Sequence, residues 1–427
     1  MKVVIVGGGW AGSGAAIAAK NAGAEEVVLL ERTDMLLGTG LVGGIMRNNG
    51  RFTATEEMIA MGGNEIFETI DANCRHKNIR FPGHEHASLY DISLIEPAIR
   101  SLVLSKGVEV RLQARMKDVK KDGDKITAVV LTDDTEVTGD VFLDCTGSAG
   151  PMNNCTKYGN GCAMCVLRCP SFGGRVSLVG QAGIPEKMGK KADGSIGAMS
   201  GSCKLFKESL SQEIIDMLNE TGVAVIPIPE KLRKGEGVLA TKACQQYALR
   251  EFAENIILLD TGHAKLMTPY YPLAMLHQIP GFENARYEDP YAGGKGNSMR
   301  YMALAPRTND LRVKGLANVF CGGEKAGLLV GHTEAIVTGT LAGYNAVQYL
   351  LGKETLTLPE TLCIGDAIRY VGEAMETEEG MTKKYTFSGS VYFNRMKELG
   401  LYTTDLSAIR ERVEKAGLAG IFSAKRS

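Results

Sequence analysis

Three glycines near the start of the chain, Gly7, Gly9 and Gly12, have the spacing of a turn that binds the phosphates of a dinucleotide. Gly7 permits the tight turn, Gly9 lets the backbone approach a pyrophosphate, and Gly12 allows a helix to pack closely on a strand. The N-terminus of that helix would offer unpaired N–H groups and a positive dipole to the phosphates. Glu31 ends the next apolar run, where its carboxylate can accept hydrogen bonds from ribose hydroxyls. A glycine-rich turn without a ligand is the alternative.

Later segments favour FAD over NAD as the dinucleotide. The apolar strand 141–143 leads to Thr146-Gly147, a turn that looks like the second FAD signature of flavoproteins with two dinucleotide folds. Farther on, residues 318–324 run from a strand into a glycine-rich loop, and residues 331–335 open another helix. A helix N-terminus there would stabilise a reduced flavin, because its N1–C2 carbonyl region gains negative charge. A plain strand-to-helix crossover is the alternative. The residues expected to bind FAD are Gly7, Gly9, Trp10, Ala11, Gly12, Glu31, Arg32, Gly43, Gly44, Met116, Thr146, Gly147, Gly323, Glu324 and Thr333.

Four of the ten cysteines fall within one short stretch, at Cys155, Cys162, Cys165 and Cys169. Their spacing is C-x6-C-x2-C-x3-C-P, and its end matches the end of the bacterial ferredoxin pattern, including the proline. Gly159 stands where a ferredoxin would have its first cysteine. These four thiolates are predicted to hold a [4Fe–4S] cluster that exchanges single electrons with the flavin.

Three other interpretations of the same cysteines stay open. Cys162 and Cys165 form a C-x-x-C pair that could react with the flavin as a redox-active thiol site, provided that a thiol pKa is lowered. A structural zinc is the second interpretation, although the paired C-x2-C spacing occurs once only. The third is that the thiols are small buried apolar side chains that line the flavin pocket. The glycines around them favour a close approach of the backbone to a ligand in each case.

A glycine-rich stretch from Gly38 to Thr53 is expected to run under the flavin. Its Arg47, Asn48 and Asn49 could bind flavin nitrogen or oxygen atoms, or an anionic substrate, and a solvated loop is the alternative. In the late loop, His332 and Glu324 could hydrogen-bond flavin or substrate, or could serve as caps. The candidate catalytic residues are Cys162, Cys165, Arg47, Asn48 and His332. Candidates for the substrate pocket are Tyr270, Tyr271, His277 and Arg300, with His263 a weaker one.

Hydrophobic periodicity predicts the elements that position these residues. Strands are expected at 2–6, 26–31, 108–112 and 141–143, helices at 12–22, 54–79 and 91–106, and a β-meander at 114–138. This order predicts an α/β fold with a Rossmann-type FAD-binding domain of the two-dinucleotide-fold kind. The FAD domain is expected to be discontinuous, from 1–150 and 311–352, with an inserted substrate and cysteine-cluster domain at 151–310 and a helical C-terminal region at 353–427.

The composition narrows the class of protein. Apolar residues make up 44% and charged residues 23%, as in ordinary globular proteins. Lys plus Arg number 48 against 49 Asp plus Glu, which argues against the basic surface that non-specific nucleic-acid binding requires. The sequence contains no stretch of 18 apolar residues, so no membrane span is expected. The chain opens directly into a strand without a signal peptide, so a cytoplasmic location and reduced cysteines are expected.

The motifs resemble those of a known family. The N-terminal fingerprint, the segment 279–285 (IPGFENA), the loop 323–335 and the helix 339–346 resemble the FAD-dependent tRNA-modifying flavoproteins of the GidA and TrmFO types. The resemblance is good at both ends of the chain and poor in the middle, and it implies the fold, the FAD cofactor and a homo-oligomer. The TrmFO branch, a folate-dependent tRNA uracil methyltransferase, carries a catalytic cysteine in an early loop. The corresponding stretch, Gly38 to Thr53, has none, so the resemblance does not bring methyltransferase activity to this chain.

The predicted function is an FAD-dependent oxidoreductase that couples its flavin to a cysteine-ligated [4Fe–4S] cluster. Its partner is expected to be a small-molecule substrate or an electron-transfer protein, without a membrane. One alternative is a folate- and FAD-dependent enzyme that modifies uracil in a nucleic acid. The other is a flavin–thiol oxidoreductase that uses the pair Cys162 and Cys165.

Overall fold

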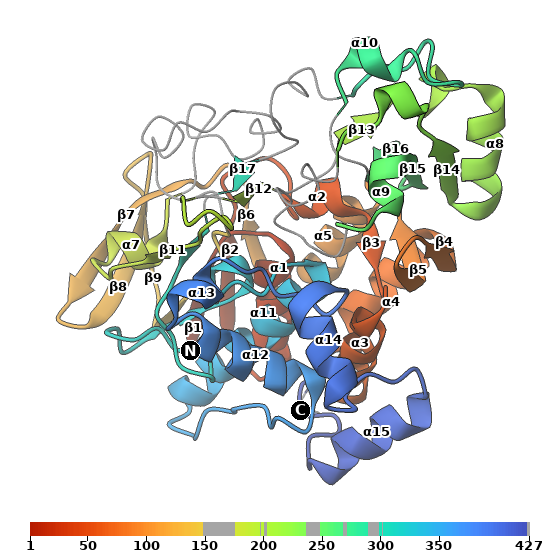
Figure 1. Ribbon diagram of the computed structural model, residues 1–427. Helices are drawn as coiled ribbons and strands as arrows, with labels where there is room; N and C mark the ends of the chain where they lie inside the picture. The colour runs from red at the N-terminus through yellow and green to blue at the C-terminus, as the bar shows by residue number, and fades with distance from the viewer. Residues whose placement is uncertain are drawn as a thin grey trace.

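A five-stranded parallel sheet lies at the centre of the molecule (Figure 1). The computed structural model describes residues 1–147, 176–196, 198–199, 203–235, 248–267, 271–288, 299–300 and 302–424. Each neighbouring pair of strands in the sheet is parallel. Parallel sheets are covered on both faces, which is why the strands at Lys2–Val6 and Glu26–Leu30 are nearly continuous runs of Val, Ile and Leu. In spatial order the strands are β19 (Val319–Cys321), β10 (Val141–Asp144), β1 (Lys2–Val6), β2 (Glu26–Leu30) and β6 (Glu109–Arg111).

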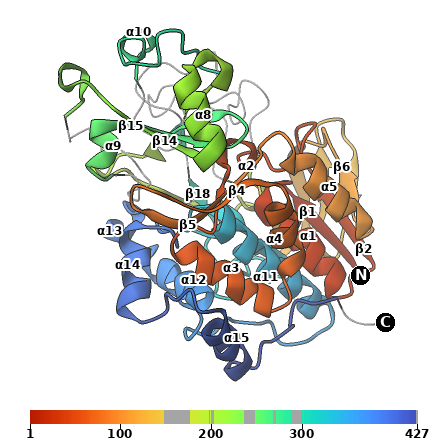
Figure 2. The same ribbon diagram turned by 90° about the vertical axis from the view of Figure 1, so that its right-hand side faces the viewer.

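Two helices, α1 (Trp10–Asn21) and α11 (His332–Leu350), pack against each other over this sheet (Figures 1 and 2). Small residues allow the close approach. A Cβ atom on Gly339 would overlap the carbonyl oxygen of Ala11, and one on Gly343 would overlap that of Ala15. Both helices start near the carboxyl ends of the strands, so their N-termini face the same region.

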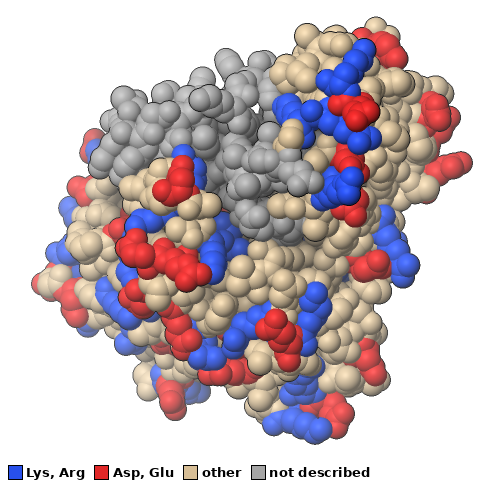
Figure 3. Space-filling view, viewed as in Figure 1, with Lys and Arg blue, Asp and Glu red and all other residues tan. Residues whose placement is uncertain are grey.

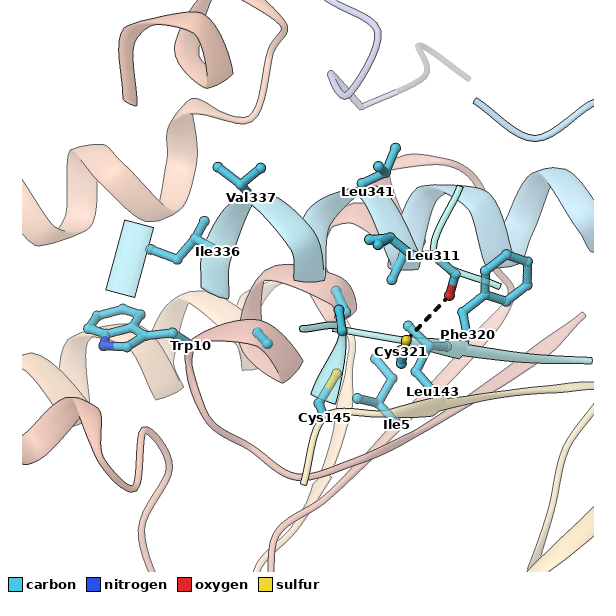
Figure 4. Close-up of a cluster of buried hydrophobic side chains, with 14 of the residues drawn as sticks. Ile5, Trp10, Leu143, Cys145, Leu311, Phe320, Cys321, Ile336, Val337 and Leu341 are labelled. Carbon is cyan, nitrogen blue, oxygen red and sulfur yellow. Dashed lines mark hydrogen bonds between the residues drawn. The ribbon is translucent and has the colours of Figure 1, made fainter. Parts of the chain in front are cut away.

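The core between α11 and the sheet is apolar, as Figure 4 shows. Ile5 of β1, Leu143 of β10 and Phe320 of β19 meet Ile336 and Leu341 of α11, and all five side chains are fully buried. The sheet therefore unites the start of the chain with a segment some three hundred residues later, and the packing of α11 stabilises that union.

The predicted β-meander is confirmed as an antiparallel sheet of β7 (Met116–Asp122), β8 (Lys125–Leu131) and β9 (Glu136–Thr138). The predicted helix at 91–106 corresponds to α5 (Ile95–Ser105). The smaller elements of the middle of the chain are α7 (Leu178–Gln181), β11 (Lys187–Met188), β12 (Ala198–Met199), β17 (Met299–Arg300) and β18 (Ala303–Leu304).

The predicted helix at 54–79 is wrong in its last part. Helices α3 (Gly50–Ala60) and α4 (Asn64–Ala72) are followed by β4 (Cys74–Phe81), which forms a hairpin with β5 (His84–Tyr90). The hairpin turns at Gly83, whose φ is +75° and suits glycine. With β3 (Ile45–Met46), the hairpin makes a three-stranded sheet. Pairing with β5 decided the structure of 74–81, and helical periodicity does not record such pairing.

A separate lobe follows in the chain and lies at the upper right of Figure 1. Its antiparallel sheet has the order β13-β16-β15-β14 and its own apolar core, which includes Leu218, Leu258 and Phe282. A second cluster, with Leu89 of β5 and Leu259 of β15, joins the lobe to the β3-β5-β4 sheet. The lobe contains β13 (Cys203–Leu205), η2 (Lys207–Ser209), α8 (Gln212–Thr221), β14 (Val223–Pro227), η3 (Glu230–Leu232), α9 (Glu251–Glu254), β15 (Asn255–Asp260), β16 (Ala264–Leu266) and α10 (Leu273–Leu276).

The predicted helical C-terminal region is confirmed. Its helices lie near α3, on the side of the molecule where Figure 2 shows α12, α14 and α15. They are α12 (Cys363–Ala374), α13 (Glu378–Met381), α14 (Ser390–Glu398) and α15 (Leu406–Lys415). None of the helices that the structure describes combines the length and apolar character needed to cross a membrane.

Candidate functional site

The glycine-rich turn between β1 and α1 has the geometry that a pyrophosphate requires. Gly7 has a φ of +102°, and a Cβ on it would overlap the Cys145 carbonyl. A Cβ on Gly12 would overlap the carbonyl oxygen of Gly7. A Cβ on Gly9 would instead meet no atom within 4 Å among the described residues. The fold therefore requires Gly7 and Gly12, whereas Gly9 faces open space at the helix N-terminus, where phosphates bind.

Glu31 lies at the end of β2 beside this turn. Its Oε2 accepts a hydrogen bond from the Gly8 N–H at 2.8 Å, and its Oε1 accepts bonds from the N–H and hydroxyl of Thr33 at 2.9 and 3.0 Å. Burial lowers the pKa of the neighbouring Arg32, although the Glu31 carboxylate opposes that decrease. Met116, at the start of β7, is buried. The turn thus holds the Glu31 carboxylate in place, as a ribose-binding group requires.

The N-termini of α1 and α11 converge on one region. The ring centroids of Trp10 and His332, the first residues of the two helices, are 6.0 Å apart. Thr333 is fully buried, and its hydroxyl has no hydrogen-bond partner in the described part of the chain. The same holds for the indole N–H of Trp10, whose side chain is 3% exposed. A buried polar group without a partner costs about 1–3 kcal/mol, so these two groups point to a ligand between the helices.

The remaining predicted FAD residues lie at the same edge of the sheet. After β10, the N–H and hydroxyl of Thr146 both donate to Asp144 Oδ1, at 3.0 and 2.7 Å, and Gly147 follows with a φ of +75°. After β19, the Gly323 N–H donates to the Thr338 hydroxyl of α11 at 2.8 Å. The structure therefore brings together the turns that follow β1, β10 and β19, and the residues present fit the phosphates, ribose and flavin of FAD.

A buried polar network that the sequence did not predict lies beside these turns. Asp144 Oδ2 accepts hydrogen bonds from the Ser177 hydroxyl at 3.3 Å and from the Val179 N–H at 3.0 Å. Lys325 is 1% exposed, donates to the Ser177 hydroxyl at 3.0 Å and forms an ion pair with Glu186. The Asp144 carboxylate thus binds both Thr146 and Ser177, so these two residues lie at the same point of the sheet edge.

The loop around α2 (Gly40–Gly43) is fixed from several elements. The Tyr90 hydroxyl donates to the Gly40 carbonyl at 2.6 Å, and the buried Lys265 ammonium donates to the Val42 carbonyl at 2.6 Å. A Cβ on Gly43 would overlap the imidazole of His332. Gly44 has a φ of +83°, and a Cβ there would overlap Thr261. Tyr90 and Lys265 were missed because their partners are backbone carbonyls in a distant segment, which no local pattern reveals.

Arg47 and Asn48, two predicted catalytic residues, are bound within the scaffold. The Arg47 guanidinium forms ion pairs with Glu56 at 2.5 Å and Asp71 at 2.6 Å. Burial opposes its charge, but these two carboxylates raise the Arg47 pKa. Asn48 is fully buried, and its amide nitrogen lies 3.0 Å from His84 Nδ1. The alternative of a solvated loop is therefore wrong, and these contacts favour a structural role for both residues.

A buried ion pair, also unpredicted, secures the N-terminus of α11. Arg51 Nε of α3 lies 3.0 Å from Glu334 Oε1, and the two side chains are 6% and 0% exposed. Glu334 also accepts bonds from the Thr386 hydroxyl at 2.7 Å and the Phe387 N–H at 3.0 Å. Gly331 leaves room for the pair, since a Cβ there would overlap both charged groups.

The predicted metal ligands Cys155, Cys162, Cys165 and Cys169 lie outside the described residues, as do Tyr270 and the side chain of Arg300. Among the described residues, no group of three or more His, Cys, Asp or Glu side chains is arranged to hold a metal ion. Burial raises the pKa of Cys321 to about 12, so that described cysteine is a poor nucleophile.

The described substrate-pocket candidates make contacts within their own lobe. The Tyr271 hydroxyl donates to the Leu232 carbonyl at 3.1 Å. His277 Nε2 lies 2.8 Å from the Ala285 carbonyl, and His263 Nδ1 lies 2.9 Å from Glu288. These contacts account for the three side chains without a substrate.

Comparisons with known proteins agree with this site. Residues 2–152 match the family model of FAD dependent oxidoreductases, and residues 239–354 match that of glucose inhibited division protein A. A methylenetetrahydrofolate–tRNA-(uracil-5-)-methyltransferase TrmFO from Caldicellulosiruptor bescii is 34% identical over 110 residues, which cover 25% of this chain and 24% of that protein. The TrmFO of Streptococcus sanguinis is 31% identical over 141 residues, which cover 33% of this chain and 28% of that protein. The matched region thus spans about a quarter of the length of these relatives.

The fold as a whole matches a solved structure. GidA of Aquifex aeolicus, in its form II crystal, superposes with a TM-score of 0.66 at 17% identity over 97% of this chain and 76% of that chain. Its form I crystal gives a TM-score of 0.60. At this identity the likeness concerns the fold alone. The predicted α/β fold, FAD as the cofactor and the FAD-dependent oxidoreductase class are supported by these matches. The chain therefore resembles the flavoproteins of the GidA and TrmFO type, and its residues 2–152 match the family of FAD dependent oxidoreductases.

Proposed function

We propose that the protein is an FAD-dependent oxidoreductase whose flavin lies at the converging N-termini of α1 and α11 and exchanges electrons with a [4Fe–4S] cluster. The observation that carries the flavin part is that the buried indole N–H of Trp10 and the buried hydroxyl of Thr333 have no hydrogen-bond partner of good geometry among the described residues, beside the open face of Gly9. When bound, FAD supplies chemistry that passes electrons singly or in pairs.

Different residues around this site would bind the pyrophosphate, a ribose and the flavin ring of FAD. The backbone N–H groups that follow Gly9 would bind the pyrophosphate, and Glu31 would accept hydrogen bonds from a ribose. The positive end of the α11 dipole would stabilise negative charge on the flavin, and the Thr333 hydroxyl would hydrogen-bond it. His332 would hold or accept a proton beside the same ring system.

The cluster part of the proposal rests on the cysteine spacing and on the flanks of the segment that carries it. Cys155, Cys162, Cys165 and Cys169 would be the four thiolate ligands. The flanking residues Thr146 and Ser177 both bind Asp144 at the end of β10, the strand next to β1. The segment therefore starts and ends beside the proposed flavin site. The electron partner would be a small molecule or an electron-transfer protein.

Anaerobic purification tests the proposal. We expect a brown protein that contains bound FAD and about four irons per chain, with broad absorbance near ~400 nm. The fourfold Cys→Ser variant at the proposed ligands should lose the iron and keep FAD, whereas Cys74→Ser should keep both. An iron-free yellow protein would contradict the cluster. In that case a Cys162–Cys165 disulfide that the reduced flavin opens would support the thiol alternative, and one bound zinc would support the structural alternative.

A second candidate is a folate-dependent uracil-modifying enzyme, which the identity to TrmFO proteins favours. On the face shown in Figure 3, however, Lys and Arg side chains are interspersed with Asp and Glu among the described residues. Binding of bulk tRNA at low salt that weakens steeply as salt is added, together with methyl transfer from a folate, would support this candidate. The absence of binding at low salt would remove it.

A further inference from the structure

The first turn of α11 carries a buried carboxylate that anchors a segment of the C-terminal region. Glu334 is fully buried, and its Oε1 accepts hydrogen bonds from the Thr386 hydroxyl at 2.7 Å and the Phe387 N–H at 3.0 Å. These two partners lie between α13 and α14, 52 and 53 residues farther along the chain. The anchor therefore stands at the helix end where the flavin site is proposed.

The charge of this carboxylate opposes the dipole of its own helix. Gly331 precedes α11, and a Cβ on it would overlap both Glu334 Oε2 and Arg51 Nη2. The Glu334 side chain therefore folds back to the N-terminus of the helix. The unpaired N–H groups of a helix N-terminus act as about +0.5 of an elementary charge. A carboxylate without a cation would bring the sum to about −0.5, which reverses the sign of the helix end.

Arg51 of α3 supplies the compensating cation. Its Nε lies 3.0 Å from Oε1 and 3.1 Å from Oε2 of Glu334. Its Nη1 donates to Asn48 Oδ1 at 3.1 Å, and its Nη2 donates to the Thr386 hydroxyl at 3.1 Å. These contacts fix the guanidinium beside the carboxylate in the interior, where a charge acts on its neighbours more strongly than in water. With Arg51 in place, the sum of charges at the helix end is again about +0.5.

We propose that Arg51 is a positioning residue that keeps the N-terminus of α11 net positive, so that the site favours reduced over oxidised flavin. Glu334 is needed as the anchor of the segment before α14, and Arg51 cancels its charge. A flavin ring that takes up two electrons and one proton gains one negative charge, which a positive helix end stabilises. Arg51 acts through Glu334 and the helix end, so it need not contact the flavin. This inference rests on the proposed flavin site.

The midpoint potential of the bound flavin tests this role, measured against a dye of known potential during anaerobic reduction with dithionite. Arg51→Gln leaves the Glu334 carboxylate without its cation and should lower the potential. The affinity for reduced relative to oxidised FAD should fall at least about tenfold, or about 30 mV for a two-electron couple. Glu334→Gln can still accept both hydrogen bonds but carries no charge, so it should raise the potential. The double variant Arg51→Gln, Glu334→Gln should return close to the wild-type value.

Two further variants serve as controls. Arg51→Lys keeps the positive charge and should keep a potential close to that of the wild type. Arg395→Gln removes a guanidinium that pairs with the buried Asp366 at 2.7 Å and joins α14 to α12 instead of α11. It should leave the potential unchanged although it also strands a buried carboxylate. Circular dichroism confirms that each variant is folded.

The signs of the shifts separate this role from a structural one. Loss of packing alone would weaken FAD binding in both single variants without moving their potentials in opposite directions. FAD-loaded variants with unchanged potentials, or with shifts of the same sign, would overturn the role of Arg51. If Arg51→Gln does not fold, Glu334→Gln decides alone, because an unchanged or lowered potential in that variant contradicts the inference. A wild-type protein that binds no FAD would instead refute the proposed flavin site, and this inference with it.

Discussion

At Gly9 the fold tolerates a side chain, whereas the proposed pyrophosphate site does not. Because a Cβ there meets no atom within 4 Å of the described chain, Gly9→Ala should fold with an unchanged midpoint of thermal unfolding. Its affinity for FAD should fall at least about tenfold, or ~1.4 kcal/mol, because the methyl group lies where the pyrophosphate approaches. Titration of apoprotein with FAD measures this. Gly235→Ala is the control, since a Cβ there would likewise meet no atom within 4 Å among the described residues. Unchanged FAD affinity in Gly9→Ala would contradict the assignment of this turn.

Thr333 allows a second test at the scale of one hydroxyl. Its Oγ1 is buried and unpartnered in the described part of the chain, so Thr333→Val should leave the apoprotein as stable as the wild type or slightly more stable. The FAD complex should instead lose about 1 kcal/mol, because the hydroxyl gains its partner from the cofactor. Thermal unfolding with and without FAD measures both effects. Equal losses in the two states would show that the hydroxyl has a protein partner.

At the scale of elements, the buried pair Arg51–Glu334 joins α3 to the first turn of α11. Arg51→Met should destabilise the protein by ~3–5 kcal/mol, because it leaves the Glu334 carboxylate buried without its cation. The double variant Arg51→Met, Glu334→Leu should recover part of that loss, since both charges are removed. Urea unfolding of the two variants gives the comparison. A double variant that is less stable than Arg51→Met would contradict this explanation, because the loss would then not come from the unpaired Glu334 carboxylate.

Some elements of the fold could be predicted from the sequence and others could not. The strands at 2–6 and 141–143, the meander and the glycines of the first turn were predictable, because local periodicity and turn chemistry specify them. The strand β4 was not, because its pairing with β5 outweighs a helical pattern. In the site, Gly7, Gly12 and Thr146 could be found from motifs. Tyr90, Lys265 and the Arg51–Glu334 pair could not, since each contact joins segments hundreds of residues apart or binds a backbone carbonyl.

At the scale of the whole molecule, one carboxylate connects the separate lobe to the β4–β5 hairpin. Asp260 of β15 is fully buried and contacts Lys207 at 2.8 Å, His76 at 2.9 Å and Arg75 at 3.0 Å. Burial alone would raise the Asp260 pKa, but the hydrogen bonds from these three side chains outweigh it and lower the pKa below 3.8. The ionised Asp260 therefore stabilises the fold above that pH, and the contribution disappears as the pH falls through the lowered pKa.

Asp260→Asn tests this connection. The variant should lose about 1–3 kcal/mol of the free energy of unfolding at pH 7, and the difference from the wild type should narrow as the pH falls toward 3. Urea unfolding at a series of pH values measures it. Asp193→Asn is the control and should have little effect, because that exposed carboxylate accepts hydrogen bonds from the N–H and hydroxyl of Ser195, two residues away in the same turn. A difference that does not depend on pH would show that the ionisation of Asp260 is not what stabilises the contact.

The hydrogen bonds of Asp144 suggest that the segment 148–175 can be replaced without unfolding the protein. Because Asp144 binds Thr146 before the segment 148–175 and Ser177 after it, the two described flanks of this segment are held at one point of the sheet edge. The entropy of closing such a loop changes only slowly with its length. Replacement of 148–175 by a short glycine-serine linker should therefore leave a folded, FAD-binding protein without iron, and different segments grafted at this point could give one flavin scaffold different electron partners.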